Sequence, residues 1–400
     1  MNTINLKLTA IACIAYLGFF PAVQAQTKPQ RTIIIMMDGF GESYYRNSEM
    51  PNLNKIEKKG IYKVVPSLMP AVTNVNNVAI ATGTTPAMNG ITGNVYYNVS
   101  KGVEEYIESP SLVMAPTIFQ RAKEQGVKSA LFSSKKKTID VLGTYADITL
   151  CPECDNAKTA KWLTDLGTPP DVYSKDISYW IFKAAIKTLK EEPEVGLIYI
   201  HSTDYPMHMW APEEKDSKDF LNHIDQLIGE LIKAAPDACI LMTADHGMNH
   251  KTLGVDLTQV CKRKNTPVKI SISPEKDRYM KHHKGLGGSA YVYLNTPSDA
   301  AAVKKTLLET EGIEAVLTRE EAAKKYELMP SRIGDFMVIG NKSTVFGDLA
   351  GKETEALDQH YRSHGSPYEA NVPVFIYNAL KAPKASYFDF NYKIAAWLYR

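Results

Sequence analysis

The sequence predicts an α/β protein built on a doubly wound, mostly parallel sheet with helices on both faces and an inserted smaller α+β cap subdomain. Three observations lead to this fold class: continuous apolar strand patterns, helical patterns that alternate with them, and one long stretch of different composition. The chain has 400 residues, of which 44% are hydrophobic and 22% are charged. This composition excludes intrinsic disorder, and the length predicts one large domain with a substantial insertion, or two domains.

Six apolar, β-branched segments are predicted strands, and most of them end at polar or glycine residues where a loop should begin. They are residues 32–37, 127–132, 195–200, 238–243, 290–294 and 372–377. Helical patterns lie between them, notably residues 115–124, 177–190, 216–233 and 298–309. Continuous apolar strands that alternate with helices favour a parallel sheet covered on both faces.

The stretch 253–345 differs from its surroundings because it is richer in lysine and carries its own strand and helix patterns. We predict that it is the inserted cap subdomain, which lies beside the mouth of the main sheet. The catalytic domain is then formed by residues 26–252 and 346–400. The alternative is that residues 253–345 are further units of the main sheet.

The first 25 residues have the pattern of a signal peptide. A short cationic start ending at Lys7 is followed by a mostly apolar run, and Val23 and Ala25 provide the small residues that a signal peptidase prefers. We therefore expect cleavage after Ala25 and export, with the periplasm as the destination. A buried first helix is the alternative.

The charge balance argues against a nucleic-acid partner. The full chain has 46 Lys and Arg against 44 Asp and Glu, and a chain without residues 1–25 loses only the charge of Lys7, which leaves a net charge of +1. Binding to nucleic acid through charge requires a clear basic excess. No apolar run after residue 26 approaches the roughly 20 residues that span a bilayer, so no transmembrane segment is expected in the mature chain.

Export also affects how the cysteines are interpreted, because thiols outside the cytosol tend to pair. Cys151 and Cys154 could form half of a structural zinc site, but no second Cys-x-x-Cys pair supplies the other half. A local disulfide, or no special role, is favoured. Cys239 opens an apolar strand and is most simply a core residue.

Unusual polar residues fall where the predicted strands end, and in a doubly wound sheet ligands bind beyond those carboxyl ends. Three aspartates and three histidines arrive there from four separate segments of the chain. They are Asp38 after the first strand, Asp204 and His208 after the third, Asp245 and His246 after the fourth, and His364 in the loop before the last. Carboxylate and imidazole together suit a borderline divalent ion such as zinc, and six ligands are enough for two ions that share a substrate. The sequence therefore predicts a two-zinc site, a common arrangement for phosphoryl transfer.

Segment 69–83 contains the candidate nucleophile, Thr73. Pro70 breaks the chain, and residues 74–82 have a helical pattern that ends at Gly83, so Thr73 stands at or near the helix N-terminus. A hydroxyl there faces free backbone N–H groups and the positive end of the helix dipole, which suits a phosphate or phosphonate. A threonine nucleophile would need metal coordination near neutral pH. An ordinary N-cap role is the alternative.

Taken together, these motifs resemble the alkaline phosphatase superfamily, in particular its nucleotide pyrophosphatase/phosphodiesterase branch and, within that branch, the phosphonoacetate hydrolases. The resemblance runs from about Arg31 to the C-terminus. The motifs that carry it are Asp38-Gly, Pro70-Ala-Val-Thr73, Asn76-Asn-Val-Ala-Ile-Ala-Thr-Gly83, Gly90-Ile-Thr-Gly-Asn94, Asp204-x-x-x-His208, Asp245-His-Gly-Met and His364-Gly.

The resemblance implies a role for each matching residue. One zinc ion would be bound by Asp204, His208 and His364. The second would be bound by Asp38, Asp245 and His246, together with the oxygen of Thr73. Asn94 would donate a side-chain hydrogen bond to a non-bridging phosphoryl oxygen. The reaction would then pass through a phosphothreonine intermediate.

The choice of substrate depends on Lys135 and Lys137, which follow the predicted strand 127–132. In an extended segment, alternate residues point the same way, so the two lysines could hold one anionic group. The resemblance matches them to a Lys-x-Lys pair that grips the substrate in phosphonoacetate hydrolases. A solvated surface run is the alternative.

The expected activity is therefore cleavage of the phosphorus–carbon bond of phosphonoacetate, or a close analogue, to acetate and phosphate by a two-zinc hydrolase. The alternative is a nucleotide pyrophosphatase/phosphodiesterase or an alkaline phosphate monoesterase with the same zinc pair. In either case the partner is a small anionic phosphonate or phosphate ester. His282, His283 and Lys284 in the insertion are candidates to overhang the pocket, although surface exposure is favoured for them.

Overall fold

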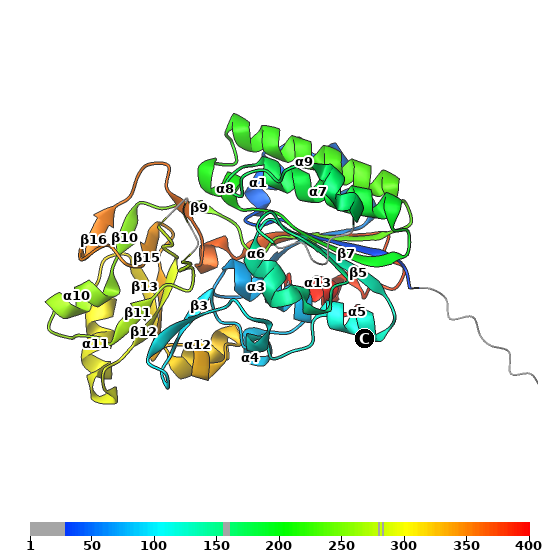
Figure 1. Ribbon diagram of the computed structural model, residues 1–400. Helices are drawn as coiled ribbons and strands as arrows, with labels where there is room; N and C mark the ends of the chain where they lie inside the picture. The colour runs from blue at the N-terminus through cyan, green and yellow to red at the C-terminus, as the bar shows by residue number, and fades with distance from the viewer. Residues whose placement is uncertain (1–28, 155–160, 279–280, 282–283) are drawn as a thin grey trace, which may run out of the picture.

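A seven-stranded sheet between two helical layers forms the larger part of the molecule, and a smaller lobe stands beside it (Figure 1). The computed structural model describes residues 29–154, 161–278, 281 and 284–400. The strands, in spatial order, are β2 (Ile61–Pro66), β18 (Asn371–Tyr377), β8 (Cys239–Thr243), β1 (Thr32–Met36), β7 (Val195–His201), β5 (Lys128–Ser133) and β6 (Ile148–Leu150). Only β18 runs antiparallel to its two neighbours, so the predicted mostly parallel α/β sheet is confirmed.

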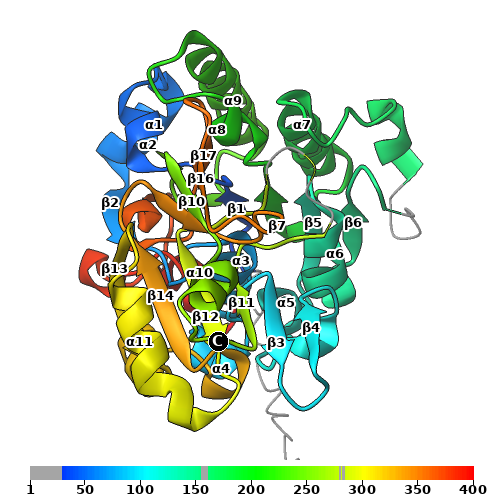
Figure 2. The same cartoon turned by 90° about the vertical axis from the view of Figure 1, so that its left-hand side faces the viewer.

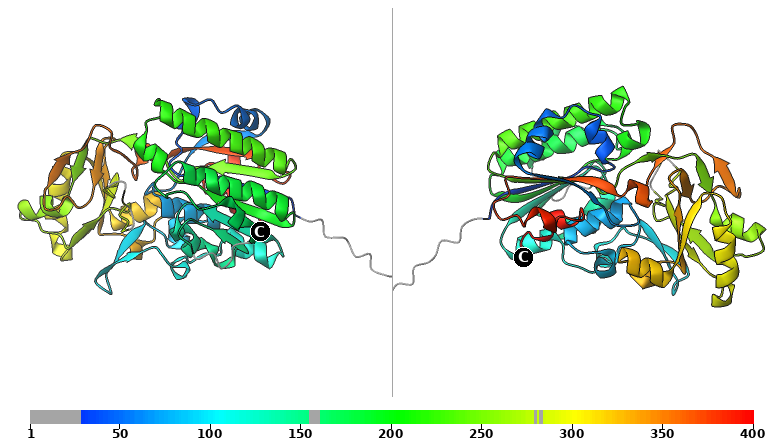
Figure 3. Two further views of the ribbon diagram at one scale, coloured as in Figure 1. Left: turned by 45° about the horizontal axis from the view of Figure 1, so that its top comes forward. Right: turned by 180° about the vertical axis from the view of Figure 1, so that it is seen from behind.

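The two helical layers cover opposite faces of this sheet (Figures 1 and 3). On one face lie α1 (Glu42–Arg46), α2 (Pro51–Lys59), α7 (Asp176–Glu191), α8 (Tyr205–Met209) and α9 (Lys215–Ala234). On the other lie α3 (Thr73–Thr82), α5 (Ile118–Glu124), α6 (Lys136–Leu142) and α13 (Lys393–Ala396). Ile33 and Ile35 of β1 belong to the core under α7 and α9. Ile34 and Met36 belong to the core over α3 and α5, because successive strand residues point to opposite faces.

Most of the predicted elements begin and end within a few residues of the observed ones. The predicted helix 115–124 begins only at Ile118, because the hydroxyl of Thr117 accepts a hydrogen bond from the N–H of Gln120 and caps the helix there. Strands β2 and β6 were not predicted. Both lie at the edges of the sheet, where β2 is largely half-buried and β6 has only three residues, so neither has a long apolar pattern.

The smaller lobe, here called the cap, contains one antiparallel sheet of four strands and one mixed sheet of three strands (Figure 2). One consists of β11 (Ile270–Ile272), β12 (Ser289–Tyr293), β14 (Phe336–Gly340) and β13 (Ile313–Thr318), with the helices α10 (Leu257–Arg263), α11 (Ala300–Leu308) and α12 (Arg319–Tyr326). The other consists of β15 (Thr344–Phe346), β10 (Leu253–Val255) and β16 (Thr354–Ala356). The strands of the cap therefore run from Leu253 to Ala356, and the predicted strand 290–294 belongs to the cap sheet.

Short elements connect the cap with the main sheet. A hairpin of β3 (Val95–Asn98) and β4 (Val103–Tyr106) follows the turn helix α4 (Pro86–Asn89). Its Tyr97 packs against Tyr293 of the cap, with 5.2 Å between ring centroids. A second connection pairs β9 (Asn249–His250) with β17 (Arg362–Ser363). These contacts join the cap to the edge of the main sheet from which the candidate site residues come.

A disulfide joins Cys151 and Cys154, which confirms the predicted local pairing. Cys239 is buried at the start of β8. No helix in the described part of the chain is long and apolar enough to cross a membrane. The predicted signal peptide, His282 and His283 lie outside the described residues, and Lys284 forms a 2.7 Å ion pair with Glu355 in the cap.

Candidate metal centre and active site

The structure brings all six predicted metal ligands to one edge of the main sheet, and each is at most 6% exposed. Asp38 follows β1, Asp204 and His208 follow β7, Asp245 and His246 follow β8, and His364 precedes β18. Five of them come from the carboxyl ends of parallel strands, which share one edge of the sheet. Because β18 runs antiparallel to β8, its start lies at that same edge, and this brings His364 to the others.

Two groups of ligand atoms lie close enough to hold metal ions, with all atoms of a group within 4.8 Å of one another. One group is Asp38, Asp245 and His246, as the resemblance implies. The other is Asp204, His246 and His364, so that His246 is common to both groups. Nε2 of His208 lies 3.3 Å from Oδ2 of Asp204, beside the second group.

All three histidines point the same ring atom into the cluster. Their Nδ1 atoms each lie 2.9 Å from a backbone carbonyl oxygen: that of Arg362 for His208, that of Gly247 for His246, and that of Ala71 for His364. A carbonyl only accepts, so each Nδ1 carries the proton and each Nε2 presents a lone pair to the cluster. Metal-binding histidines in proteins are held in this way.

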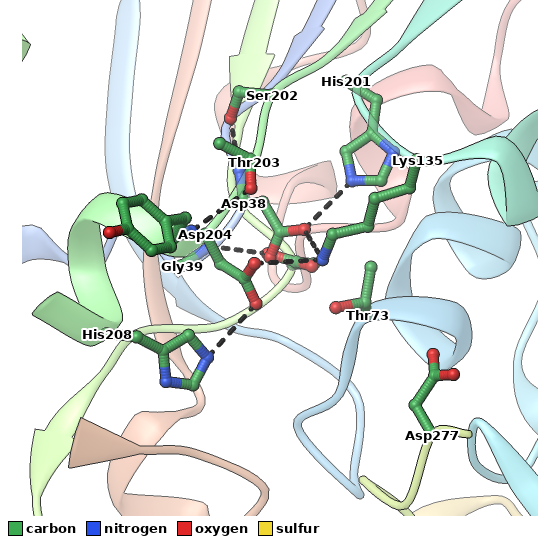
Figure 4. A network of polar contacts seen from close by, with 12 residues as sticks. Asp38, Gly39, Thr73, Lys135, His201, Ser202, Thr203, Asp204, His208 and Asp277 are labelled. Carbon is green, nitrogen blue, oxygen red and sulfur yellow. Dashed lines mark hydrogen bonds and ion pairs between the residues drawn. The ribbon is translucent and has the colours of Figure 1, made fainter. Parts of the chain in front are cut away.

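The charge of the cluster also fits divalent cations. The ammonium of Lys135 lies 2.6 Å from Asp38 and 3.1 Å from Asp204 (Figure 4). The carboxylate of Asp245 is buried in the same cluster, so three carboxylates share this ammonium. Burial and the carboxylate of Asp38 raise the pKa of Asp245 well above its ordinary value. Among the described residues, Oδ1 of Asp38 and Oδ2 of Asp245 are buried without a hydrogen-bond partner. Bound cations would compensate this excess negative charge.

Lys135 and His201 both act on the carboxylate of Asp38. Burial and the carboxylate of Asp204 tend to raise the pKa of Asp38, but the ammonium of Lys135 and the ring of His201 bring it below its ordinary value. Nε2 of His201 lies 3.1 Å from Oδ2 of Asp38. The Asp38 side chain is therefore held ionised, as a metal ligand requires.

Thr73 is the first residue of α3, and its side chain lies beside the cluster (Figure 4). The N-cap position is occupied by Val72, which leaves the Thr73 hydroxyl out of the capping role. Its Oγ1 lies 3.5 Å from Nε2 of His246. The structure thus places this hydroxyl at the helix N-terminus and next to a predicted metal ligand.

Asn94 contacts Asn74, the residue after Thr73, and has 4% of its surface exposed. Its Oδ1 accepts a hydrogen bond from the backbone N–H of Asn74 at 3.2 Å, which fixes the orientation of the amide. Its Nδ2 points to Glu275 of the cap, 3.2 Å from Oε2 and 3.3 Å from the backbone oxygen. The amide donor and the Thr73 hydroxyl line the same cavity, which has a volume of about 380 Å³.

The two predicted substrate lysines line this cavity too. The extended segment predicted for them is wrong, because the chain is helical from Lys136 onward. Helix α6 begins at Lys136, and Lys135 occupies the N-cap position. Lys135 therefore reaches Asp38 and Asp204, whereas Lys137 forms an ion pair with Asp277 of the cap. The two ammonium groups contact different carboxylates.

Sequence reasoning missed three residues of the site: His201, Glu275 and Asp277. His201 is the last residue of β7, and a polar residue at a strand end was the signal that could have revealed it. Glu275 and Asp277 are in the link between β11 and β12, and no local pattern marks them. They reach the cavity only because the cap docks against the main sheet.

Comparison with known proteins gives one matching family, described as type I phosphodiesterase / nucleotide pyrophosphatase, over residues 32–367. The fold is similar to that of phosphonoacetate hydrolase from Sinorhizobium meliloti 1021, solved in complex with phosphonoacetate, with a TM-score of 0.82. That comparison has 30% sequence identity and covers 92% of this chain and 95% of the other. Murine ectonucleotide pyrophosphatase / phosphodiesterase 5 has a TM-score of 0.64 at 15% identity, over 92% of this chain and 94% of the other, which shows the fold alone.

Curated relatives are more distant in sequence. Venom phosphodiesterase of Macrovipera lebetinus is 26% identical over 238 residues, which are 54% of this chain and 25% of the relative. Human ectonucleotide pyrophosphatase/phosphodiesterase family member 1 is 22% identical over 242 residues, which are 57% of this chain and 24% of the relative. The matched region thus covers about a quarter of the length of these two proteins.

Proposed function

Since the chain belongs to the type I phosphodiesterase / nucleotide pyrophosphatase family, we propose that it is an exported two-zinc hydrolase that cleaves the phosphorus–carbon bond of phosphonoacetate or a close analogue. The observation that carries this proposal is the cavity in which Thr73 and Asn94 lie together with Lys135 and Lys137. The similarity to a phosphonoacetate hydrolase over 92% of the chain supports the choice of substrate. The leader pattern in residues 1–25 supports export to the periplasm.

The donor set of three carboxylates and three imidazoles suits zinc. Ions held by these residues supply Lewis acidity, which lowers the pKa of a hydroxyl and offsets the charge of the phosphonate. The Thr73 hydroxyl, which lies 3.5 Å from His246, gives its proton to solvent water as its oxygen attacks phosphorus. The bond from phosphorus to carbon breaks, and the acetate carbanion takes a proton from water. Water then hydrolyses the phosphothreonine and releases phosphate.

Asn94 and the two lysines orient the substrate in this scheme. The amide of Asn94, fixed by the N–H of Asn74, donates to a non-bridging oxygen on phosphorus. Lys137 holds the carboxylate of the substrate, in exchange for the carboxylate of Asp277 that it contacts in the structure. Lys135 contributes a second positive charge. Its ammonium contacts Asp38 and Asp204, so it lies among the proposed metal ligands, whereas Lys137 contacts the cap.

A phosphodiesterase or phosphate monoesterase with the same zinc pair is the second candidate, favoured by the curated phosphodiesterase relatives. Initial rates of the zinc-loaded enzyme on phosphonoacetate, an aryl phosphate monoester and an aryl phosphate diester separate the two. We expect acetate and phosphate in equal amounts from phosphonoacetate, with the highest kcat/KM of the three substrates. Rapid turnover of either ester without turnover of phosphonoacetate would assign the second function.

Replacement of Lys137 with alanine tests how the substrate is held. Loss of one charge-assisted contact with a bound anion costs about 1.5–3 kcal/mol, so kcat/KM for phosphonoacetate should fall roughly ten- to a hundredfold. An aryl phosphate diester with a neutral tail has no carboxylate to hold, and its kcat/KM should change by about twofold at most. The measurement is kcat/KM of both substrates for the parent enzyme and the variant.

Lys136→Ala is the matched control, because Lys136 lines the same cavity but its side chain is 49% exposed and paired with Asp140. This variant should retain both rates. Equal losses on both substrates in Lys137→Ala would place Lys137 at the phosphoryl group and contradict a role in holding the carboxylate.

A further inference from the structure

Glu275 is a buried carboxylate that the cap places in the active-site cavity, and the scheme above gives it no role. It is only 2% exposed and lines the cavity with Thr73. The backbone fixes it there, since the carbonyl of Pro274 accepts a hydrogen bond from the N–H of Asn94 at 2.7 Å. The N–H of Glu275 donates to Oγ of Ser273 at 3.3 Å. This position is therefore set by the docking of the cap.

The charged neighbours of Glu275 in the chain have partners of their own. The ammonium of Lys276 lies 2.7 Å from both carboxylate oxygens of Glu104, and Asp277 pairs with Lys137. Glu275 instead contacts an amide and an imidazole ring. Its Oε2 accepts from the neutral amide of Asn94 at 3.2 Å, and its Oε1 lies 3.4 Å from Nε2 of His364. A buried carboxylate needs a positive partner, because removing its charge from water is costly.

The contact with His364 indicates the position at which a positive partner of Glu275 would bind. Nδ1 of His364 lies 2.9 Å from the carbonyl oxygen of Ala71 and donates to it, so Nε2 is the ring atom that faces Glu275. Nε2 lies 3.4 Å from Oε1 of Glu275, both side chains are buried, and Nε2 has no hydrogen-bond partner among the described residues. An imidazole nitrogen and a carboxylate oxygen at this distance in a dry site need a cation or a proton between them. His364 belongs to one of the two groups of potential metal ligands.

We propose that Glu275 is a further metal ligand, contributed by the cap to the ion that His364 holds. This inference rests on the metal-dependent function proposed above and extends it, because the ligands would then come from both lobes of the molecule. The same carboxylate contacts Asn94, so binding of the ion, orientation of the phosphoryl-binding amide and docking of the cap are linked through one side chain.

Zinc titration of the metal-free enzyme tests this role without measuring turnover. The parent enzyme should bind two equivalents. Glu275→Gln keeps the size and a hydrogen-bond acceptor for Asn94 but removes the charge, so one equivalent should bind as before and the other roughly ten- to a hundredfold more weakly. Competition with a chromophoric chelator measures both affinities.

Glu104→Gln is the matched control, since it removes the ion pair of Lys276 next to Glu275 without changing the cavity. It should bind both equivalents like the parent, which shows that a disturbed cap segment alone does not weaken the metal site. If Glu275→Gln does not fold, Glu275→Asp, which withdraws the carboxylate by one methylene, is titrated instead, with the same loss expected.

Unchanged affinity for both equivalents in the Glu275 variant would overturn the inference and leave Glu275 as a hydrogen-bond partner of a protonated His364. Failure of the parent enzyme to bind two equivalents would instead contradict the proposed two-zinc function. The two failures are therefore distinguishable in one series of titrations.

Discussion

Replacement of Thr73 with alanine is expected to lower kcat/KM by about a thousandfold or more, because it removes the nucleophile of the proposed reaction. The hydroxyl is at the N-terminus of α3 and 3.5 Å from Nε2 of His246. Its neighbours in the cavity, such as Asn94 and Lys137, can bind the substrate but cannot form the covalent intermediate. KM should therefore change much less than kcat.

The fold should tolerate this change, because the N-cap of α3 is Val72 and not Thr73. The melting temperature and the zinc content of the variant should match those of the parent. Thr82→Ala, at the other end of α3, is the matched control. Its buried hydroxyl donates to the carbonyl of Val78 at 2.8 Å, so this variant should lose about 1 kcal/mol of stability and retain its activity.

Single-turnover experiments complete the test. In the parent enzyme, phosphate should become attached to Thr73 and be detectable by mass spectrometry after acid quenching. A Thr73→Ala variant that still hydrolysed the substrate at the parent rate would exclude Thr73 as the nucleophile and would leave direct attack by water.

The layered architecture could be predicted because its signals are local. Alternate residues of β1 face two different cores, so every residue of this strand after Thr32 is apolar, and this is the pattern of a buried parallel strand. The family resemblance drawn from the ordered motifs is confirmed by the match over residues 32–367. Edge strand β2 was missed, because its Val64 is 37% exposed and Lys63 interrupts the apolar run.

The site was only partly predictable, for a physical reason. Asp38 and Asp245 are each the second residue after a buried strand, so the position of the strand also fixes the position of the ligand. The direction of Lys135 depended instead on where α6 begins, and Lys136 already belongs to the helix. Glu275 reaches the site only through the contact between the cap and the larger lobe. The local sequence around Glu275 does not predict such a long-range contact.

Replacement of Asp245 with asparagine is expected to remove one equivalent of zinc and to lower kcat/KM by more than about a hundredfold. Oδ1 of Asp245 accepts hydrogen bonds from the N–H groups of Gly39 and His246, both at 3.0 Å, and an asparagine oxygen can accept both. Oδ2 is buried without a hydrogen-bond partner in the described structure. Asparagine would place an N–H donor there, where a metal ion needs a lone pair.

The stability of this variant should change in opposite directions with and without zinc. Burial and the carboxylate of Asp38 raise the pKa of Asp245, so in the metal-free protein the cost of ionising Asp245 lowers stability as the pH rises from its ordinary pKa up to the raised one. Without the charge, Asp245→Asn should melt at a higher temperature than the parent in the presence of a chelator at pH 7. With excess zinc the order should reverse, because only the parent gains the full binding free energy of two ions.

Asp225→Asn is the control, since buried Asp225 accepts hydrogen bonds from the N–H groups of Asn52 and Leu53 outside the cluster. It should lose stability equally in both conditions, and the same behaviour in Asp245→Asn would show that Asp245 is structural and not a metal ligand.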